Sequence, residues 1–534
     1  MKFVSDPQIT VKIRKMKERV RWQEQSIVDR GIDQTRMVLE SPTTDSPEFS
    51  FLVAGDSGTS NHRGHNPQRQ VAQQMISERE NCRFVLHTGD VVYLVGSSEY
   101  YLQNFIRPYR EFIVGGEHPS RIAYDRMVFN FPFLPVPGNH DYYDLPIVYG
   151  LLSATALPLR RLLGAKLDLD VGWHGSDRGN AYAKAFLDYL QAHKMPGELD
   201  RHLDAHYTAS TSTGRCLRYQ PGRFTRLPNR YYTFRSGGID FFALDSNTFN
   251  EPLPIPKTKQ GDIRRQNLEL DRQKLEQEKL AMLEMCDRLN PEIPSEAEQL
   301  DDLSAKLEQL DEMLIDIDKQ LSSHKTAATD VEQLEWLKKR LIDSWRDSEV
   351  RGRVIYLHHP PYVTEATKWN QAQTLAVRLR LREVLDGVAD AVGEVARGRP
   401  LVDLVLTGHA HCLEYLRTGN TGHGDSGINW IVCGGSGHSL RRQRPEGPML
   451  QEPSSPEADR LAREGGRSQK GDRPIAESLL FVGRSGQGSH KRRPYSCLRI
   501  DVLDGCPPKF RIRPLVVERF EGKWHEISIE PFVI

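Results

Sequence analysis

The sequence predicts a layered α/β fold with a helical hairpin inserted into it, and three observations indicate this. Helical stretches such as 68–80 and 331–345 alternate with strand-like runs, as in folds that pack helices against sheets. Residues 262–325 interrupt this alternation, because they contain no glycine and are rich in Glu, Gln, Leu and Lys. The strand-like runs are short, apolar or β-branched, and bounded by glycine or polar clusters; they lie within 49–58, 82–90, 129–141, 240–247, 352–361, 401–411 and 428–438.

Length and composition limit the classes of protein to which the chain can belong. The chain has 534 residues, more than one ordinary core accommodates, and equal numbers (72 each) of Lys+Arg and Asp+Glu. A formal charge of zero gives no general reason to expect nucleic acid or an anionic membrane as partner. No apolar run approaches the roughly 20 residues of a spanning helix. The basic N-terminus lacks the apolar segment of a signal peptide, and seven scattered cysteines do not suggest a disulfide framework, so we expect a cytoplasmic protein.

The inserted segment has the pattern of an antiparallel coiled-coil hairpin. Its second half has an apolar seam with alternating spacings of three and four, formed by Leu300, Leu303, Leu307, Leu310, Leu314, Ile317 and Leu321. Upstream, a sevenfold repeat is formed by Leu268, Leu275, Met282 and Leu289, and Asn290-Pro291 supplies the break. Pairing within the hairpin is slightly favoured over a homodimer formed through it. Insertions at surface connections are well tolerated, so we expect the hairpin to leave the functional site undisturbed.

This pattern gives an expected domain organisation. An N-terminal arm and linker precede the main domain, whose two parts flank the hairpin. The expected segments are 1–48 (arm and linker), 49–261 (first part, with a lid-like insertion at 150–230), 262–325 (hairpin) and 326–534 (second part, with a flexible loop at about 441–475).

Polar clusters follow five of the strand-like runs. Ligands in α/β folds lie beyond the carboxyl ends of strands, so these clusters are expected to meet at one edge. Carboxylate, amide oxygen and imidazole suit first-row transition metals, and two such ions can clamp an in-line displacement at phosphorus. No GxxxxGK[ST] loop or GxSxG elbow is present. The clusters are Gly55-Asp56-Ser57-Gly58, Gly89-Asp90-Val91-Val92-Tyr93, Gly138-Asn139-His140-Asp141, His358-His359-Pro360 and Gly408-His409-Ala410-His411.

The order GD, GDxxY, GNHD, HxP, GHxH resembles the calcineurin-like metallophosphoesterase superfamily. Two features narrow the resemblance to its purple acid phosphatase branch: Asp56 is followed by Gly58 where most members have histidine, and the second motif ends in Tyr93. The resemblance covers about 49–250 and 330–440. It implies a four-layer αββα sandwich of two sheets, into which the hairpin is inserted.

The resemblance also implies two metal ions and the residues that hold them. The first ion, ferric iron in that family, would be bound by Asp56, Asp90, Tyr93 and His411. The second, Fe²⁺, Zn²⁺ or Mn²⁺, would be bound by Asp90, Asn139, His358 and His409, with Asp90 shared. His140 would protonate the leaving group, and Asp141 would orient His140. His359 would support a metal ligand or contact substrate; an alternative exchanges the roles of His358 and His359.

The expected function is therefore hydrolysis of phosphate esters by attack of a metal-bound hydroxide, with His140 aiding the leaving group. Two alternatives remain open at this point. One is a phosphodiesterase of the wider superfamily, for example acting on a cyclic nucleotide. The other is a catalytically inactive coiled-coil scaffold, which the complete set of ligand-competent residues disfavours.

Overall fold

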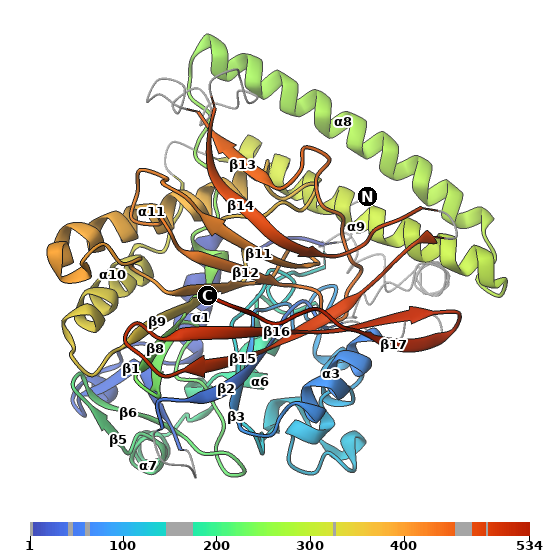
Figure 1. Cartoon of the computed structure of the whole chain (residues 1–534). Helices are drawn as coiled ribbons and strands as arrows, with labels where there is room; N and C mark the ends of the chain where they lie inside the picture. Colours follow the sequence, from blue (N-terminus) through green and yellow to red (C-terminus); the bar gives the residue numbers. More distant parts are fainter. Residues whose placement is uncertain are drawn as a thin grey trace.

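The computed structural model describes residues 4–40, 46–58, 65–145, 175–323, 327–453, 472–487 and 490–534. Within these ranges two β-sheets lie face to face and helices cover their outer surfaces (Figure 1). The larger sheet has the order β13 (Met449–Glu452), β14 (Arg473–Val482), β11 (Leu413–Thr418), β12 (Asn429–Cys433), β10 (Leu404–Thr407), β9 (Gly352–Tyr356), β8 (Ile239–Ala243), β7 (Tyr232–Ser236), β1 (Ile32–Leu39), β6 (Gly214–Tyr219) and β5 (Ala209–Thr211).

The smaller sheet brings the first motif-bearing strands together with the end of the chain. Its order is β17 (Lys523–Ile527), β16 (Lys509–Phe520), β15 (Tyr495–Leu503), β2 (Phe49–Ala54), β3 (Cys82–His87) and β4 (Phe133–Pro135), and β18 (Phe532–Val533) pairs with β16. The strands β2, β3 and β4 run parallel, as do β8, β9, β10 and β12 in the larger sheet. The motif residues that follow the carboxyl ends of these parallel strands therefore lie at the same edge of each sheet.

Aromatic side chains fill the space between the two sheets. Phe51 and Phe84 of the smaller sheet meet Phe234 and Phe241 of the larger one, and the rings of Phe84 and Phe241 have centroids 5.2 Å apart. This ring distance and the edge-on geometry are those of favourable aromatic pairs. The sheet-to-sheet interface is thus the main core.

Helices form the two outer layers. On the larger sheet, α10 (Val331–Arg346) and α11 (Ala372–Val392) bury side chains such as Leu337 and Leu381 against strand residues such as Val405. On the smaller sheet, α3 (Pro67–Ser77) packs on β15 and β16. The remaining helices of four residues or more in the described chain are α1 (Ile9–Arg19), α2 (Gln25–Val28), α6 (Asn180–Phe186), α7 (Pro196–His206), α8 (Lys259–Arg288) and α9 (Pro294–Ser322), besides short 3₁₀ and π turns. The predicted α/β sandwich is confirmed.

The inserted segment consists of the two long helices α8 and α9, which pack antiparallel (Figure 1, green and yellow-green). Lys306 near the middle of α9 pairs with Glu278 of α8 at 2.7 Å, and Gln320 near the end of α9 accepts a hydrogen bond from Arg264 near the start of α8. Their shared apolar cluster consists of Met282, Cys286, Leu300, Leu307 and Leu310, with Leu275, Leu283, Leu289 and Leu303 at its edge. Apolar seam residues are thus buried within one chain. Supercoiling of the pair stays a prediction.

Three of the expected boundaries differ from the structure or lie outside it. Residues 1–48 contain not only an arm but strand β1, which pairs with β6 and β7 inside the larger sheet. The expected loop at 441–475 contains β13, because Met449–Glu452 pairs with β14; residues 454–471 lie outside the described chain. Of the lid-like insertion, 150–174 also lies outside it, and the rest forms α6, α7, β5 and β6. No described helix combines the length and apolarity needed to cross a membrane.

A buried carboxyl on β11 predicts a pH-dependent stability. Glu414 is fully buried and accepts hydrogen bonds from the Thr364 backbone N–H and hydroxyl. Burial raises its pKa to about 7. Between the unfolded pKa near 4.5 and pH 7, the unfolded chain releases a proton that the folded chain retains, so stability falls as pH rises through this window.

We expect Glu414→Gln, which cannot ionise, to gain stability relative to the parent between pH 4.5 and 7, by on the order of 3 kcal/mol. Denaturant unfolding at a series of pH values measures this difference. Glu446→Gln, at a carboxylate 63% exposed, is the control. A difference between Glu414→Gln and parent that does not change with pH contradicts the prediction.

Candidate metal centre

Three of the predicted metal ligands have backbone conformations that residues other than glycine rarely adopt. Asp56, Asp90 and His409 follow β2, β3 and β10 with φ of 54°, 55° and 64°. A left-handed backbone conformation costs free energy in any residue other than glycine, and residues that adopt it are concentrated at functional sites. The chain turns sharply after each strand, which aims the three side chains into one space.

The residues predicted for the first metal surround the Tyr93 hydroxyl. It donates to Asp90 Oδ2 at 2.9 Å or to Asp56 Oδ1 at 3.1 Å, and His411 Nε2 lies 3.2 Å away. His411 Nδ1 lies 2.9 Å from the Ser439 carbonyl oxygen, so its N–H is held there and Nε2 faces the cluster. Four donors from three separate loops thus meet around one point.

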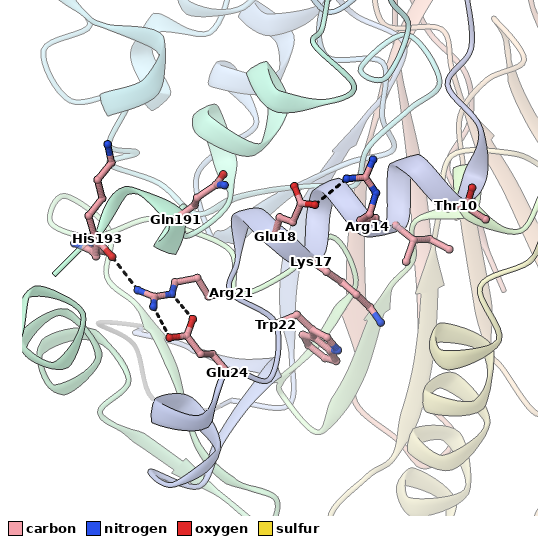
Figure 2. Close-up of a pocket in the computed structure, with 11 residues that line it drawn as sticks. Thr10, Arg14, Lys17, Glu18, Arg21, Trp22, Glu24, Gln191 and His193 are labelled. Atoms are coloured by element: carbon pink, nitrogen blue, oxygen red, sulfur yellow. Dashed lines mark hydrogen bonds and ion pairs between the residues drawn. The ribbon is translucent and has the colours of Figure 1, made fainter. Parts of the chain in front are cut away.

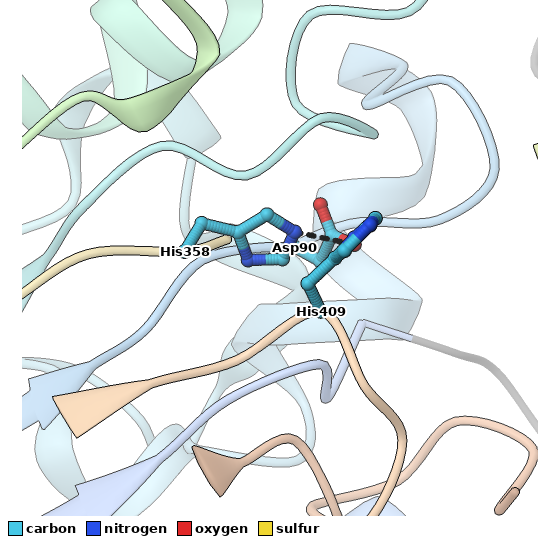
Figure 3. A group of neighbouring side chains, drawn as sticks. All are labelled: Asp90, His358 and His409. Atoms are coloured by element: carbon cyan, nitrogen blue, oxygen red, sulfur yellow. Dashed lines mark ion pairs between the residues drawn. The ribbon is translucent and has the colours of Figure 1, made fainter. Parts of the chain in front are cut away.

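The residues predicted for the second metal adjoin the first group. His358 Nε2 lies 2.8 Å from Asn139 Oδ1 and 3.3 Å from Asp90 Oδ2, as Figure 3 shows for the aspartate. Its Nδ1 is held by the Thr88 carbonyl at 2.8 Å. Donor atoms of Asp90, His358 and His409 all lie within 4.8 Å of one another, the only such acidic or histidine cluster among the described residues. Asp90 belongs to both groups.

Close backbone packing holds these loops together. A Cβ at Gly138 would lie 2.1 Å from Asp90 Oδ1, so only glycine permits this approach. The Asp141 carboxylate accepts from the backbone N–H of Gly138 at 2.8 Å and of Val91 at 3.1 Å. It therefore joins the GNHD turn to the GD turn. None of its described contacts is with the His140 ring, which it was expected to orient. His140 Nδ1 instead lies 2.6 Å from the Leu94 carbonyl oxygen.

His359 is held by neighbours rather than aimed at an open space. Its Nδ1 lies 2.8 Å from Ser246 Oγ and its Nε2 3.2 Å from Asn250 Nδ2. The side chain is 2% exposed, and its ring centroid is 4.5 Å from that of His409. Both ring nitrogens are engaged, so the geometry favours support of His409 over the expected contact with substrate.

Burial and mutual proximity govern the charges of the centre. Burial raises the pKa of Asp56 to about 8, and the neighbouring Asp90 adds to the effect. Burial also opposes ionisation of Asp90, but the adjacent His358 outweighs it and lowers the pKa of Asp90 well below its usual range. Reciprocally, the Asp90 carboxylate overcomes burial and raises the pKa of His358 to about 9. Asp90 and His358 therefore form a buried ion pair.

The residues present fit two transition-metal ions. Two carboxylates, a phenol, an amide oxygen and three imidazoles offer the oxygen and nitrogen donors that such ions take. The Nδ1–H groups of His358 and His411 are held by carbonyls, the usual support for a histidine that binds metal through Nε2. Lys368 Nζ lies 3.0 Å from His409 Nε2, the atom through which this histidine would bind a metal.

One family model matches part of the chain. Residues 49–203 match the family model described as calcineurin-like phosphoesterase. This segment carries the first three of the five motifs, so it is similar to the calcineurin-like phosphoesterases. Among curated proteins no relative matches this chain.

Solved structures similar to this chain differ widely from it in sequence. The purple acid phosphatase PPD1 from yellow lupin (Lupinus luteus) seeds has 12% identity and a TM-score of 0.42, with 92% of this chain and 55% of that chain covered. This chain thus spans about half the length of that protein. GAP50, the anchor in the inner membrane complex of Plasmodium, has 11% identity and a TM-score of 0.34, with 90% of this chain and 89% of that chain covered. PhoD has 12% identity and a TM-score of 0.31, with 92% of this chain and 73% of that chain covered.

Two residues outside the predicted ligand set adjoin the candidate metal centre. The His438 ring stacks on Tyr93 with centroids 3.8 Å apart and planes 9° from parallel. The sequence allows an anion-binding turn or an ordinary close turn at Gly434–His438, whereas it gives no indication of Lys368. His438 follows a glycine cluster after β12, which was a usable signal, whereas Lys368 follows the HHPP motif by several residues with no motif of its own.

A separate open groove lies along α1 (Figure 2). Its cations are paired locally: Arg21 with Glu24, and Arg14 with Glu18 at 3.0 Å. None of its lining residues is a predicted metal ligand. The groove is therefore distinct from the centre described above.

Proposed function

We propose that the protein hydrolyses phosphate esters at a dinuclear metal centre of the purple acid phosphatase type. The observation that carries the proposal is the convergence of Asp56, Asp90 and His411 around the Tyr93 hydroxyl, with the second ligand group sharing Asp90. The family match supports a metal-dependent phosphoesterase in general, and the tyrosine supports the narrower type.

The two ions would be held as the sequence pattern suggests. Asp56, Asp90, Tyr93 and His411 would hold ferric iron, and Asp90, Asn139, His358 and His409 would hold Fe²⁺, Zn²⁺ or Mn²⁺. When bound, such a pair neutralises phosphate oxygens and makes a water acidic enough to attack phosphorus near neutral pH.

The protein's own residues would then prepare and complete the reaction. His140 is 5% exposed and lies beside Tyr93, with ring centroids 4.2 Å apart. With Nδ1–H held by the Leu94 carbonyl, Nε2 would carry the second proton of an imidazolium and donate it to the leaving alkoxide, which leaves a neutral ring. Asp141 keeps the turn that carries His140 against the turn that carries Asp90, so its role is positioning.

Turnover of two chromogenic substrates tests this function and separates it from its alternatives. We expect hydrolysis of p-nitrophenyl phosphate that chelation abolishes and metal restores, with a visible absorption band that Tyr93→Phe removes. A colourless enzyme that prefers bis-p-nitrophenyl phosphate is instead a phosphodiesterase of the wider superfamily. Absence of both metal and turnover would leave the inactive scaffold and contradict the proposal.

A further inference from the structure

Helix α9 of the hairpin lies directly against the metal centre, contrary to the expectation that the hairpin leaves it undisturbed. Glu308 and Glu312 are one turn apart and therefore share a face of the helix. Glu312 Oε2 pairs with Lys368 Nζ at 2.6 Å, and Glu308 Oε2 lies 2.7 Å from His438 Nε2. Lys368 in turn contacts the predicted ligand His409, and His438 stacks on Tyr93.

The guanidinium of Arg441 lies between these two pairs. Arg441 Nη2 is 4.0 Å from Glu308 Oε2 and 3.9 Å from Glu312 Oε1, while Nη1 donates to the Ala305 carbonyl. The side chain is 6% exposed, and Nη2 has no hydrogen-bond partner among the described residues. His438 Nδ1 is likewise buried and without a described partner. Lys368, His438 and Arg441 thus form a basic rim. The carboxylates of α9 satisfy only some of its hydrogen-bonding groups, and the others are available to an anion.

Acidic groups also fasten α9 on either side of this rim. Towards its start, Asp302 pairs with Arg484 at 2.8 Å and with Lys491 at 2.6 Å. Towards its end, Asp316 accepts from the backbone N–H groups of Ala372 and Gln373, which begin α11. The acidic face of α9 therefore lies along cations and N–H donors of the main domain.

Stability alone does not account for this arrangement. The hairpin already buries an apolar seam of its own, and buried ion pairs add little to stability because each charge loses its hydration. Cations beside a predicted metal centre are, however, what binds the oxygens of a phosphate ester. The carboxylates of α9 hold the positions that such an anion would take.

We propose that α9 is an inhibitory cap whose Glu308 and Glu312 occupy an anion-binding rim of the metal centre. The proposal rests on the proposed function and specifies its substrate and regulation. The rim receives a second anionic group of the substrate, so the preferred substrate is a phosphate ester with a further negative group. Such a substrate displaces the two carboxylates, and the hairpin must open for turnover.

The double variant Glu308→Gln/Glu312→Gln tests the cap in the full chain. It removes the two charges that hold α9 on the rim and leaves the seam and the flanking anchors intact. We expect its kcat/KM for p-nitrophenyl phosphate to rise at least about fivefold. The control is Glu276→Gln/Glu284→Gln on α8, which makes the same charge change at carboxylates 52% and 75% exposed. Unchanged or reduced turnover in the double variant, with normal metal content, overturns the proposal.

A second variant and a second measurement guard against a misfolded double variant. Asp302→Asn loosens α9 at a distance from the rim, so it should also raise turnover, by a smaller factor. Hydrogen exchange should show faster exchange of α9 amides in both variants and unchanged exchange in β2, β3, β9 and β10. Faster exchange of α9 without any gain in turnover means that the helix does not restrain the enzyme.

Calorimetry with inorganic phosphate separates this proposal from the proposed function. With metal removed by chelation, the rim cations remain, and we expect the double variant to bind phosphate at least about fivefold more tightly than the parent. If no variant takes up metal or turns over substrate, yet phosphate binding improves in this way, the proposed function fails and the occluded anion site stands. Equal phosphate affinity in parent and double variant refutes the site itself.

Discussion

Replacement of Asp90 by alanine is expected to remove both metals and with them all turnover. Asp90 Oδ2 lies 2.9 Å from the Tyr93 hydroxyl and 3.3 Å from His358 Nε2, so one carboxylate serves both ligand groups. Loss of a residue that merely supports a ligand costs about 10–100-fold in affinity or activity, and loss of a shared ligand should exceed that range. Elemental analysis of purified parent and variant measures the metal content.

The control for Asp90 is another buried aspartate away from the centre. Asp188 is 3% exposed and pairs with His202 and Tyr207. Asp188→Ala should retain full metal content even if its stability falls. An Asp90→Ala protein that binds as much metal as the parent would show that this carboxylate does not join the two ions.

Arg230→Met is expected to destabilise the protein by about 3–5 kcal/mol, the range for removing one partner of a buried ion pair. Arg230 is fully buried and lies between Asp245, at 3.2 Å, and Asp330. Asp330 caps the start of α10, and Asp245 accepts from the hydroxyl of Tyr142, two residues after His140. The substitution leaves two buried carboxylates without their cation, next to the turn that carries the GNHD motif.

The matched control is Arg235→Met. Arg235 also pairs with two aspartates, Asp240 at 2.7 Å and Asp347 at 2.8 Å, but its side chain is 28% exposed. Exposed pairs contribute about 0–1 kcal/mol, so the control should lose little through its charges. Denaturant unfolding of both variants compares them. Equal losses of unfolding free energy in the two variants would mean that burial does not determine how much the Arg230 ion pairs contribute to stability.

The convergence of the motif residues was predictable because their signal is local. Asp56, Asp90 and His409 each follow a short apolar strand closely, and parallel strands bring such ends together whatever the rest of the fold does. Strand β1 was not predictable in this way. Its sequence IDQTRMVL mixes polar and apolar residues because both of its faces are only partly buried.

The contact between α9 and the centre could not be predicted for a different reason. The heptad seam describes the face that meets α8, and it carries no information about the opposite, acidic face. The partner of Glu308, His438, is 130 residues away, and that of Glu312, Lys368, is 56 residues away. A charged helix face is usually solvated, so only the packing of the whole chain distinguishes this one from an exposed surface.

Anomalous X-ray scattering from crystals of the metal-loaded protein tests the central claim most directly. The account predicts two metal peaks about 3.5–4 Å apart, with the Asp90 carboxylate between them, Tyr93 on one and His358 on the other. A single peak, or two peaks elsewhere in the chain, would contradict a dinuclear centre built from these five strand ends.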